Sequence, residues 1–532
     1  MPRILFGVRK MAAVALADFK DRTRGYGFWF VMAIVIFQIM EMAAGNTFLT
    51  LDGFRTAYSS SWVGLMAALD LSFLLAFFGF YIVTNAIQRD IRTRVGPILA
   101  SSLLGKGSYM AGKWLSNFSV LSLIVAVEIA GALCVQISFH EDLHIVPLAL
   151  GGPFVWFALP AIAVVAAVAV FFDSIWFLRE GIGNILYFFL VLFTLPAVAA
   201  PHGYLVDWTG SQRMLRYVDA FARRSVPEFN GTIGIDSGHG FPRQIAGLHI
   251  ASMPLTLSIL ESRLIWLLIA AAIVGISILL FPYFKNEPKS LMEVWRARWK
   301  QKAKLQESNA SSFSLHRGVN YNAISTAAIR NEFRFLYLAQ IRLILRKNRW
   351  WWYGIASVLA LAPVFGRSAH ARGLLLVLAW MWPMLTWSEM GVCEIESQVS
   401  AFLFSSPKPI IRQMLSLWLA GWTIASAIGL PFAIYQMAIA DWSQLAGWLV
   451  GTLFIASLAL FAGVWSSSQK TFQLIFLLLV FSGPMRSDSR FDFMSAAPAT
   501  PHTVYPLIFL ALVVLMLALS PFGRMYQMRS TR

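Results

Sequence analysis

The sequence predicts an all-α polytopic membrane protein in which about twelve transmembrane helices form two tandem six-helix halves. The composition is the first observation: 58% of the 532 residues are hydrophobic and 13% are charged, against about 25% charged residues in soluble domains. The mean hydropathy is +0.65. The second observation is a series of apolar segments along the chain, and the third is a polar segment between them that occurs twice.

Each predicted span is an apolar segment close to the roughly 20 residues that a helix needs to cross a bilayer. Six segments fall in the first half of the chain, at residues 27–44, 62–86, 117–137, 147–172, 181–200 and 264–284. Six more fall in the second half, at residues 350–366, 373–393, 413–436, 444–466, 469–484 and 503–522. The fifth and the eleventh contain Pro or Gly and are candidates for broken or re-entrant helices.

The basic residues predict the orientation. Residues 1–25 carry six Lys or Arg, and residues 283–349 carry fourteen against four Glu. Because loops rich in Lys and Arg stay in the cytoplasm, we expect both termini and the centre of the chain to be cytoplasmic, in the inner or plasma membrane of the cell. The net charge of +17 could also indicate nucleic acid, but basic residues that gather between apolar spans favour membrane lipids as the partner.

An amphipathic segment precedes the first span of each half. Leu5, Val8, Ala12, Ala15 and Phe19 recur at helical spacing beside basic residues, as do Ile329, Phe333, Leu336 and Ile344 in the second half. Such a pattern is typical of a helix that lies on the membrane surface. We therefore expect three parts: a membrane half at 1–284, a basic cytoplasmic linker at 285–323 and a membrane half at 324–532.

The repeated polar segment lies between the second and third spans of each half. Residues 89–115 align without a gap with residues 393–419, an offset of 304. Asp90 then meets Glu394, Ser101 and Ser102 meet Ser405 and Ser406, and Trp114 and Leu115 meet Trp418 and Leu419. A polar loop at the same place in both halves indicates a duplicated structure with a duplicated docking point.

The first copy, RDIRTRVGPILASSLLGKGSYMAGKWL, resembles the cytoplasmic loop of permease subunits in type 2 ABC transporters (the ABC-2 family). The residues that carry the resemblance are Arg89, Asp90, Arg94, Ile98, Leu99, Ser101, Gly112, Lys113, Trp114 and Leu115. The second copy departs from the pattern, because Ser416-Leu417 replaces Gly112-Lys113 and Glu396 stands in place of Arg92.

The resemblance implies that residues 89–115 and 393–419 are coupling loops that dock on separate cytoplasmic ATP-binding subunits, two per chain. The implied contact residues are Arg89, Asp90, Arg92, Arg94, Ser101, Ser102, Glu394, Glu396, Ser405 and Ser406. It further implies export of a hydrophobic or amphipathic substrate. Residues 100–108, ASSLLGKGS, lack the first glycine of a phosphate loop, and Gly107 follows the lysine where Ser or Thr should stand. ATP and Mg²⁺ are therefore expected in the partner, and this chain is expected to be no enzyme.

Four acids fall in or beside the predicted spans: Glu41, Asp70, Glu128 and Glu389. Ionisable groups inside a membrane usually face an interior or a cavity, so these acids are candidates for a substrate pathway. A proton-coupled secondary transporter that uses Asp70 and Glu128 is the alternative function, and structural roles for both acids also stay open.

One further motif is His140-Glu141-Asp142-Leu143-His144, which matches the H-E-x-x-H pattern of zinc proteases. The motif lies in a short loop between two spans, followed at once by Pro147, and has no obvious third ligand. A membrane metalloprotease is therefore the least favoured alternative, and no metal site is expected. In the longer loop 201–262, Trp208, Met214, Leu215, Val218 and Phe221 predict another amphipathic helix.

Overall fold

The structure is a computed structural model, and it divides the chain into two compact units, Met1–Leu315 and His316–Arg532. The described residues are 2–51, 54–93, 95–102, 104–176, 178–179, 182–198, 207–225, 229, 231, 233–237, 243–244, 250–282, 284, 332–347, 350–396, 409–480, 483–484, 491–494 and 504–530. The expected linker at 285–323 lies outside the described residues, so it stays a prediction.

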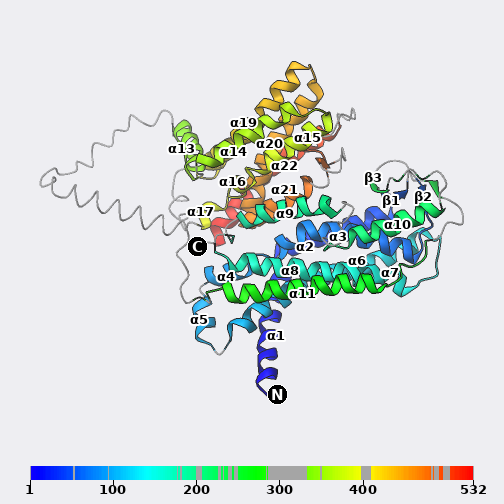
Figure 1. Cartoon of the computed structure of the whole chain (residues 1–532). Coiled ribbons are helices and arrows are strands. Elements are labelled where there is room, and N and C mark those ends of the chain that lie inside the picture. Colours follow the sequence, from blue (N-terminus) through cyan, green and yellow to red (C-terminus); the bar gives the residue numbers. More distant parts are fainter. Residues whose placement is uncertain are drawn as a thin grey trace. The chain divides into compact units, whose positions relative to one another are not determined.

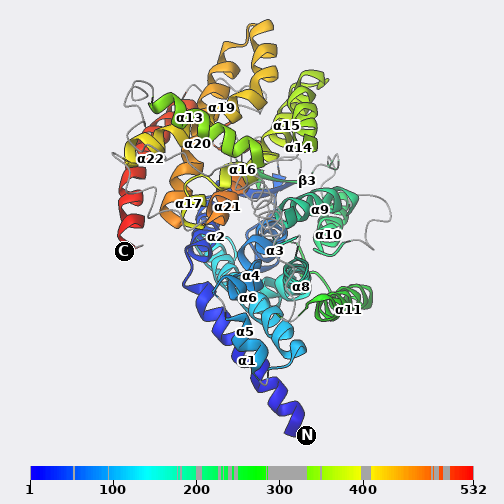
Figure 2. The ribbon, with the colours of Figure 1, turned by 90° about the vertical axis from the view of Figure 1, so that its left-hand side faces the viewer.

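The first unit is built mainly from long helices (Figure 1). In chain order they are α1 (Pro2–Thr23), α2 (Tyr26–Ala43), α3 (Ser60–Val83), α4 (Ala86–Arg92), α5 (Gly96–Ser101), α6 (Lys106–Phe139), α7 (Pro147–Pro153), the π-helical turn η1 (Phe154–Ala158), α8 (Leu159–Ser174), α9 (Ile182–Val198), α10 (Ser211–Ser225) and α11 (Leu257–Leu280). α3, α6, α8 and α11 run side by side, α1, α4 and α5 lie at one end of them, and α10 lies at the other end (Figure 1). α1 packs along α6, and Figure 2 shows its N-terminal end at the bottom of the view.

The second unit is also helical. Its elements are α13 (Glu332–Lys347), α14 (Trp350–Leu361), the 3₁₀ turn η5 (Ala362–Phe365), α15 (Ala369–Met381), α16 (Met384–Ser388), α17 (Cys393–Glu396), α19 (Pro409–Ala438), α20 (Trp442–Ser466), α21 (Gln469–Val480) and α22 (Val504–Ser530). Both units begin with an amphipathic helix that is followed after two residues by an apolar one, α1 before α2 and α13 before α14. Helices are therefore present at both predicted amphipathic segments, although Ile329 of the second lies outside the described residues. α10 matches the helix predicted in the loop 201–262.

Seven of the described helical segments are long and apolar enough to cross a bilayer, which makes this a polytopic membrane protein. They are Ser60–Ile91, Lys106–Phe139, Pro147–Ser174, Leu257–Leu280, Ile411–Ala438, Trp442–Ser466 and Tyr505–Gln527. An eighth is present if the pair α1 and α2, bent by 68°, counts as one span. The other predicted spans coincide with shorter helices, namely α9, α14 with η5, α15 and α21.

The core of the first unit is α3. Of its most apolar window 94% is buried, against 22% for Leu257–Leu280, so α3 is surrounded by protein while α11 presents a broad apolar face outward. α3 and α6 are antiparallel neighbours: the Ser60 hydroxyl at the start of α3 lies 2.9 Å from Oε1 of Gln136 near the end of α6. The stacked rings of Tyr58 and Phe139, 3.8 Å apart, close the same end.

A small four-stranded sheet, which the prediction of an all-α fold did not include, joins two loops of the first unit. Its strands are β1 (Thr47–Leu51), β2 (Phe54–Arg55), β3 (Ile233–Ser237) and β4 (Arg243–Gln244), in the order β3-β1-β2-β4. β1 pairs antiparallel with both β2 and β3, and β2 pairs parallel with β4. The pairing joins segments that are far apart in sequence, and local helix periodicity carries no signal of such a contact.

Candidate functional site

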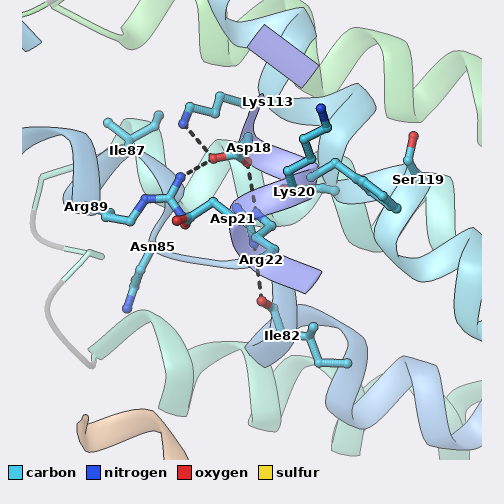
Figure 3. Close-up of polar contacts among 12 residues, drawn as sticks. Asp18, Lys20, Asp21, Arg22, Ile82, Asn85, Ile87, Arg89, Lys113 and Ser119 are labelled. Atoms are coloured by element: carbon cyan, nitrogen blue, oxygen red, sulfur yellow. Dashed lines mark hydrogen bonds and ion pairs between the residues drawn. The ribbon is translucent and has the colours of Figure 1, made fainter. Parts of the chain in front are cut away.

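Ion pairs join α1, α4 and α6 at one end of the first unit (Figure 3). Asp18 of α1 is at their centre: its carboxylate accepts from Nε of Arg22 at 2.9 Å and from Nζ of Lys113 at 3.0 Å, and it also pairs with Arg89. Arg89 reaches a second carboxylate on α1, that of Asp21. The amphipathic helix is thereby fastened to the beginning of the predicted coupling loop.

Lys113 bridges two carboxylates. Its ammonium group lies 2.8 Å from Oδ2 of Asp90 on α4 and 3.0 Å from Oδ1 of Asp18 on α1. The Tyr109 hydroxyl, one helical turn earlier on α6, donates to Oδ2 of Asp90 at 2.7 Å. Because the Lys113 side chain is only 4% exposed, its positive charge is stabilised by these two carboxylates rather than by water.

The charges around Asp18 keep it ionised. Burial by itself would raise the pKa of the Asp18 carboxyl, but the positive charges of Arg22, Lys113 and Arg89 outweigh burial and hold the pKa below its usual value. The group therefore stays an anion throughout the physiological pH range, and the network acts as a permanent clamp and not as a pH switch.

The turn between α3 and α4 is fixed by a second acid. Asp173, near the end of α8, accepts from the Thr84 hydroxyl at 3.0 Å and from the backbone N–H of Asn85 at 2.8 Å. Asn85 has φ of +66°, a left-handed conformation that Asn tolerates better than most residues. These contacts set the direction in which α4 leaves the bundle and so place Arg89 and Asp90 beside α1.

The short helix α5 has one buried and one exposed face. Leu99 packs on a buried cluster at the end of the bundle that includes Tyr109 and Phe281. Gly96 lies so close to the Phe284 ring that a Cβ would come within 2.5 Å of it. On the opposite face, the Ile98 side chain is 67% exposed. An apolar side chain on an outward face of a loop that is itself held firmly is a suitable contact for another protein.

The two copies of the repeat make matching contacts. In the first unit Tyr109 donates to Asp90, and at the aligned positions in the second unit Nε2 of Gln413 donates to Oε1 of Glu394 at 3.0 Å. The aligned pair Asp90 and Glu394 is thus bound in each unit by the residue nineteen positions later, at the start of the next long helix.

The aligned tryptophans also correspond. Nε1 of Trp114 donates from α6 to the Ala163 carbonyl on α8 at 3.2 Å, and Nε1 of Trp418 donates from α19 to the Ser457 hydroxyl on α20 at 2.9 Å. Each indole stacks on the aromatic ring four residues later, at centroid distances of 5.6 and 6.4 Å. The two copies therefore make corresponding contacts at the aligned positions that the structure describes.

The source of the positive charge differs between the copies. Leu417 occupies the position aligned with Lys113, and the partner of Glu394 is instead Arg524 of α22, with Nη2 at 3.0 Å from Oε1. The Arg524 side chain is only 1% exposed. Nη1 of Arg524 also donates to Oε1 of Gln527, whose Nε2 donates to the Ser467 hydroxyl at 3.0 Å. The second acid is thus fastened to the last helix of its unit.

Some of the predicted contact residues can be located and others cannot. Ser101 and Ser102 are exposed, and their hydroxyls donate to the carbonyls of Ile98 and Leu99 at 3.0 and 2.7 Å. Arg94, Ser405, Ser406 and the side chains of Arg92 and Glu396 lie outside the described residues, so their proposed roles stay predictions.

Several residues of the network were not predicted: Asp18, Asp21, Arg22 and Arg524. The i, i+4 spacing of Asp18 and Arg22 on an amphipathic helix was the one available signal. Nothing local marks Arg524, because its partner lies 130 residues away along the chain, at Glu394.

The H-E-x-x-H sequence does not form a zinc site. α6 ends at Phe139, and His140 has φ of +55°, so the motif lacks the helix that would place both imidazoles on one face. Oε2 of Glu141 instead accepts from the backbone N–H of Tyr58 at 2.9 Å. Among the described residues there is no group of three or more His, Cys, Asp or Glu that could hold a metal ion. His140 and His144 therefore lack the helical geometry that the metalloprotease alternative requires.

The four candidate pathway acids are in two kinds of surroundings. Glu41 and Glu389 are partly exposed, and the Asn46 amide approaches Oε1 of Glu41 at 3.4 Å. Asp70 and Glu128 are 3% and 2% exposed. Nε2 of Gln38 on α2 donates to Oδ2 of Asp70 at 2.8 Å. The deeper pair is thus enclosed by protein.

Comparison of the chain with models of known protein families, with curated proteins and with solved structures finds no match in any of the three. The fold therefore defines the class directly: a mainly helical, polytopic membrane protein.

Proposed function

We propose that this chain is the permease subunit of an ATP-driven ABC transporter, with twelve transmembrane helices in two six-helix halves. Its duplicated loops, 89–115 and 393–419, dock on separate cytoplasmic ATP-binding subunits, which hydrolyse ATP with Mg²⁺. Both termini and the linker face the cytoplasm of a cell whose inner or plasma membrane holds the protein. The substrate is hydrophobic or amphipathic and is exported.

The observation that carries the proposal is the matched anchoring of the two loops. A loop that only connects two helices needs no buried charges, yet Asp90 and Glu394 bind equivalent residues and each has a buried cation. Burying an ion pair is costly unless its geometry is good. Two buried ion pairs at aligned positions therefore favour a function in which both loops must be held rigidly.

The ion pairs offer a route for force. A push on the exposed face of α5 reaches α4, then Asp90 and Lys113 on α6, and through Asp18 the amphipathic helix α1. Packed helices and fixed ion pairs transmit displacement because they resist compression. In the second copy the same push reaches α22 through Arg524. Docking alternates the permease between two states only if the ATP-bound motor binds one of them more tightly.

The test uses a photo-crosslinking residue at Ile98, 67% exposed on α5, in a tagged full-length chain. The matched control places the same residue at Leu148, 72% exposed on α7, which follows the far end of α6. We expect an ATP-binding protein to be captured from position 98 and not from position 148. The proposal fails if neither position captures an ATP-binding protein or if only the control position does.

A second variant measures the docking contact. Replacing Ile98 by Asp places a charge in the proposed interface, and a loss of about 2 kcal/mol, typical of an interface hot spot, lowers the affinity of the ATP-binding subunit about 30-fold. The change lies on an exposed face, so the amount of protein in the membrane is expected to stay the same. Leu148→Asp is the matched control and leaves that affinity unchanged.

A further inference from the structure

A pair of buried carboxyl groups lies within the membrane bundle of the first unit, away from the proposed docking loop. Asp70 belongs to α3 and Glu128 to α6, and the two side chains are 3% and 2% exposed. They come from helices that pack against each other and against α2.

The geometry of α3 and α6 brings the two acids to one level. The contact between Ser60 and Gln136 fixes the two antiparallel helices at one end. Asp70 is ten residues from Ser60, and Glu128 is eight residues from Gln136. At 1.5 Å per residue these offsets are about 15 and about 12 Å, close to the middle of a hydrocarbon core of about 30 Å. The two carboxyl groups therefore lie at similar depths on two helices that pack against each other.

The third wall of the site comes from α2. Gln38 donates its amide to Oδ2 of Asp70. One residue further on, Ile39 packs so tightly on Gly131 of α6 that a Cβ there would come within 2.3 Å of it. Gly131 is three residues from Glu128, so α2 closes over the same part of α6 and keeps lipid away from the carboxyl pair.

The part of the chain that the structure describes offers Glu128 no partner for a negative charge. Its Oε2 is buried without a hydrogen-bond partner, and Glu128 forms no ion pair with any residue that the structure describes. Its buried neighbours on α6 include Ile124, Val125 and Ala132, none of which can stabilise an anion. An isolated carboxylate is very costly in such surroundings, and a second acid nearby raises the cost, whereas a proton removes the charge.

We propose that Glu128 and Asp70 form an intramembrane proton-binding site in which Glu128 holds the proton at neutral pH. The ligand is a proton because one bound proton neutralises Glu128, and no group of three metal-ligating residues occurs among the described residues. Gln38 orients Asp70 through its amide and so keeps the second carboxyl beside the first. The site does not depend on ATP-driven transport, so it stands or falls separately from the proposed function.

The test is infrared difference spectroscopy of the purified full-length protein in lipid at neutral pH. The C=O stretch of a protonated carboxyl is distinct from the bands of an ionised carboxylate. We expect Glu128→Gln, a neutral isostere, to remove a protonated-carboxyl band. The partly exposed Glu41 is the control, and Glu41→Gln is expected to remove carboxylate bands instead. Loss of carboxylate bands in Glu128→Gln overturns the proposal.

A second measurement covers the case in which Glu128→Gln does not fold. Dicyclohexylcarbodiimide is an apolar reagent that modifies protonated carboxyl groups, and mass spectrometry locates the adduct on the unmodified chain. We expect an adduct on Glu128 and none on Glu41. Modification of Glu128 by a water-soluble carbodiimide but not by the apolar one shows a hydrated, ionised group and contradicts the proposal.

Discussion

The clamp between α1 and α6 gives the sharpest prediction of stability. Asp18 is 2% exposed and faces Lys113 and Arg22, whose side chains are 4% and 7% exposed. Asp18→Asn keeps the shape of the side chain and removes its charge, which leaves these buried cations short of one anion. Breaking a buried pair from one side costs about 3–5 kcal/mol, so we expect a loss of that size in the free energy of unfolding.

The assay is unfolding of the purified protein by titration of mild-detergent micelles with a denaturing detergent. Asp219→Asn is the matched control, because Asp219 and Arg223 form an i, i+4 pair on α10 at 2.9 Å, the same spacing and distance as Asp18 and Arg22, but on the surface. We expect no measurable change for the control, since exposed pairs contribute little. Equal effects of Asp18→Asn and Asp219→Asn refute the reasoning.

A double variant separates charge from shape. Lys113→Met added to Asp18→Asn removes one positive and one negative charge together. Because the two residues are in contact, we expect the double variant to lose less stability than the sum of the single variants, by about 1–3 kcal/mol. Strict additivity contradicts an ion pair between them.

Three further predictions concern pH, the second unit and close packing. The stability that Asp18 provides is fully present above its unfolded pKa of 3.8 and is lost as pH falls below that value, so the difference between wild type and Asp18→Asn stays constant from pH 5 to pH 8 in the same titration. Arg524→Gln destabilises the protein, and adding Glu394→Gln restores part of the loss; no restoration contradicts the pair. Gly64→Ala places a Cβ 2.4 Å from a backbone oxygen and costs about 1–3 kcal/mol of unfolding free energy, whereas Gly107→Ala, with open space around it, costs nothing.

The helices and the repeat could be predicted from the sequence because both are local. Apolar segments of the right length coincide with α2, α3, α6 and α11, and the periodicity of apolar residues marked α1 and α13. The alignment of Asp90 with Glu394 depended only on spacing, and the structure then gave both residues the same kind of partner. The number of spans and their orientation are not local properties, because they depend on the membrane as well as on the chain.

The partners of the charged residues could not be predicted. Asp18 and Arg89 are 71 residues apart, and they meet only because α4 turns back beside α1 after the left-handed Asn85. The same holds for His140 to His144, where the sequence matched a zinc motif but the end of α6 at Phe139 removed the required helix. A sequence motif shows which side chains are present, but the backbone conformation determines whether they lie close enough to act together.

The sequence by itself determined that this is a polytopic membrane protein with amphipathic helices before its apolar segments and with one polar loop present twice, because hydrophobicity and spacing are properties of neighbouring residues. Only the tertiary structure decided that Lys113 pairs with the acid of the first loop, that Arg524 pairs with the acid of the second, and that Asp70 and Glu128 are both buried. The physical reason is that a buried charge is set by what surrounds it in space, and those neighbours come from distant parts of the chain.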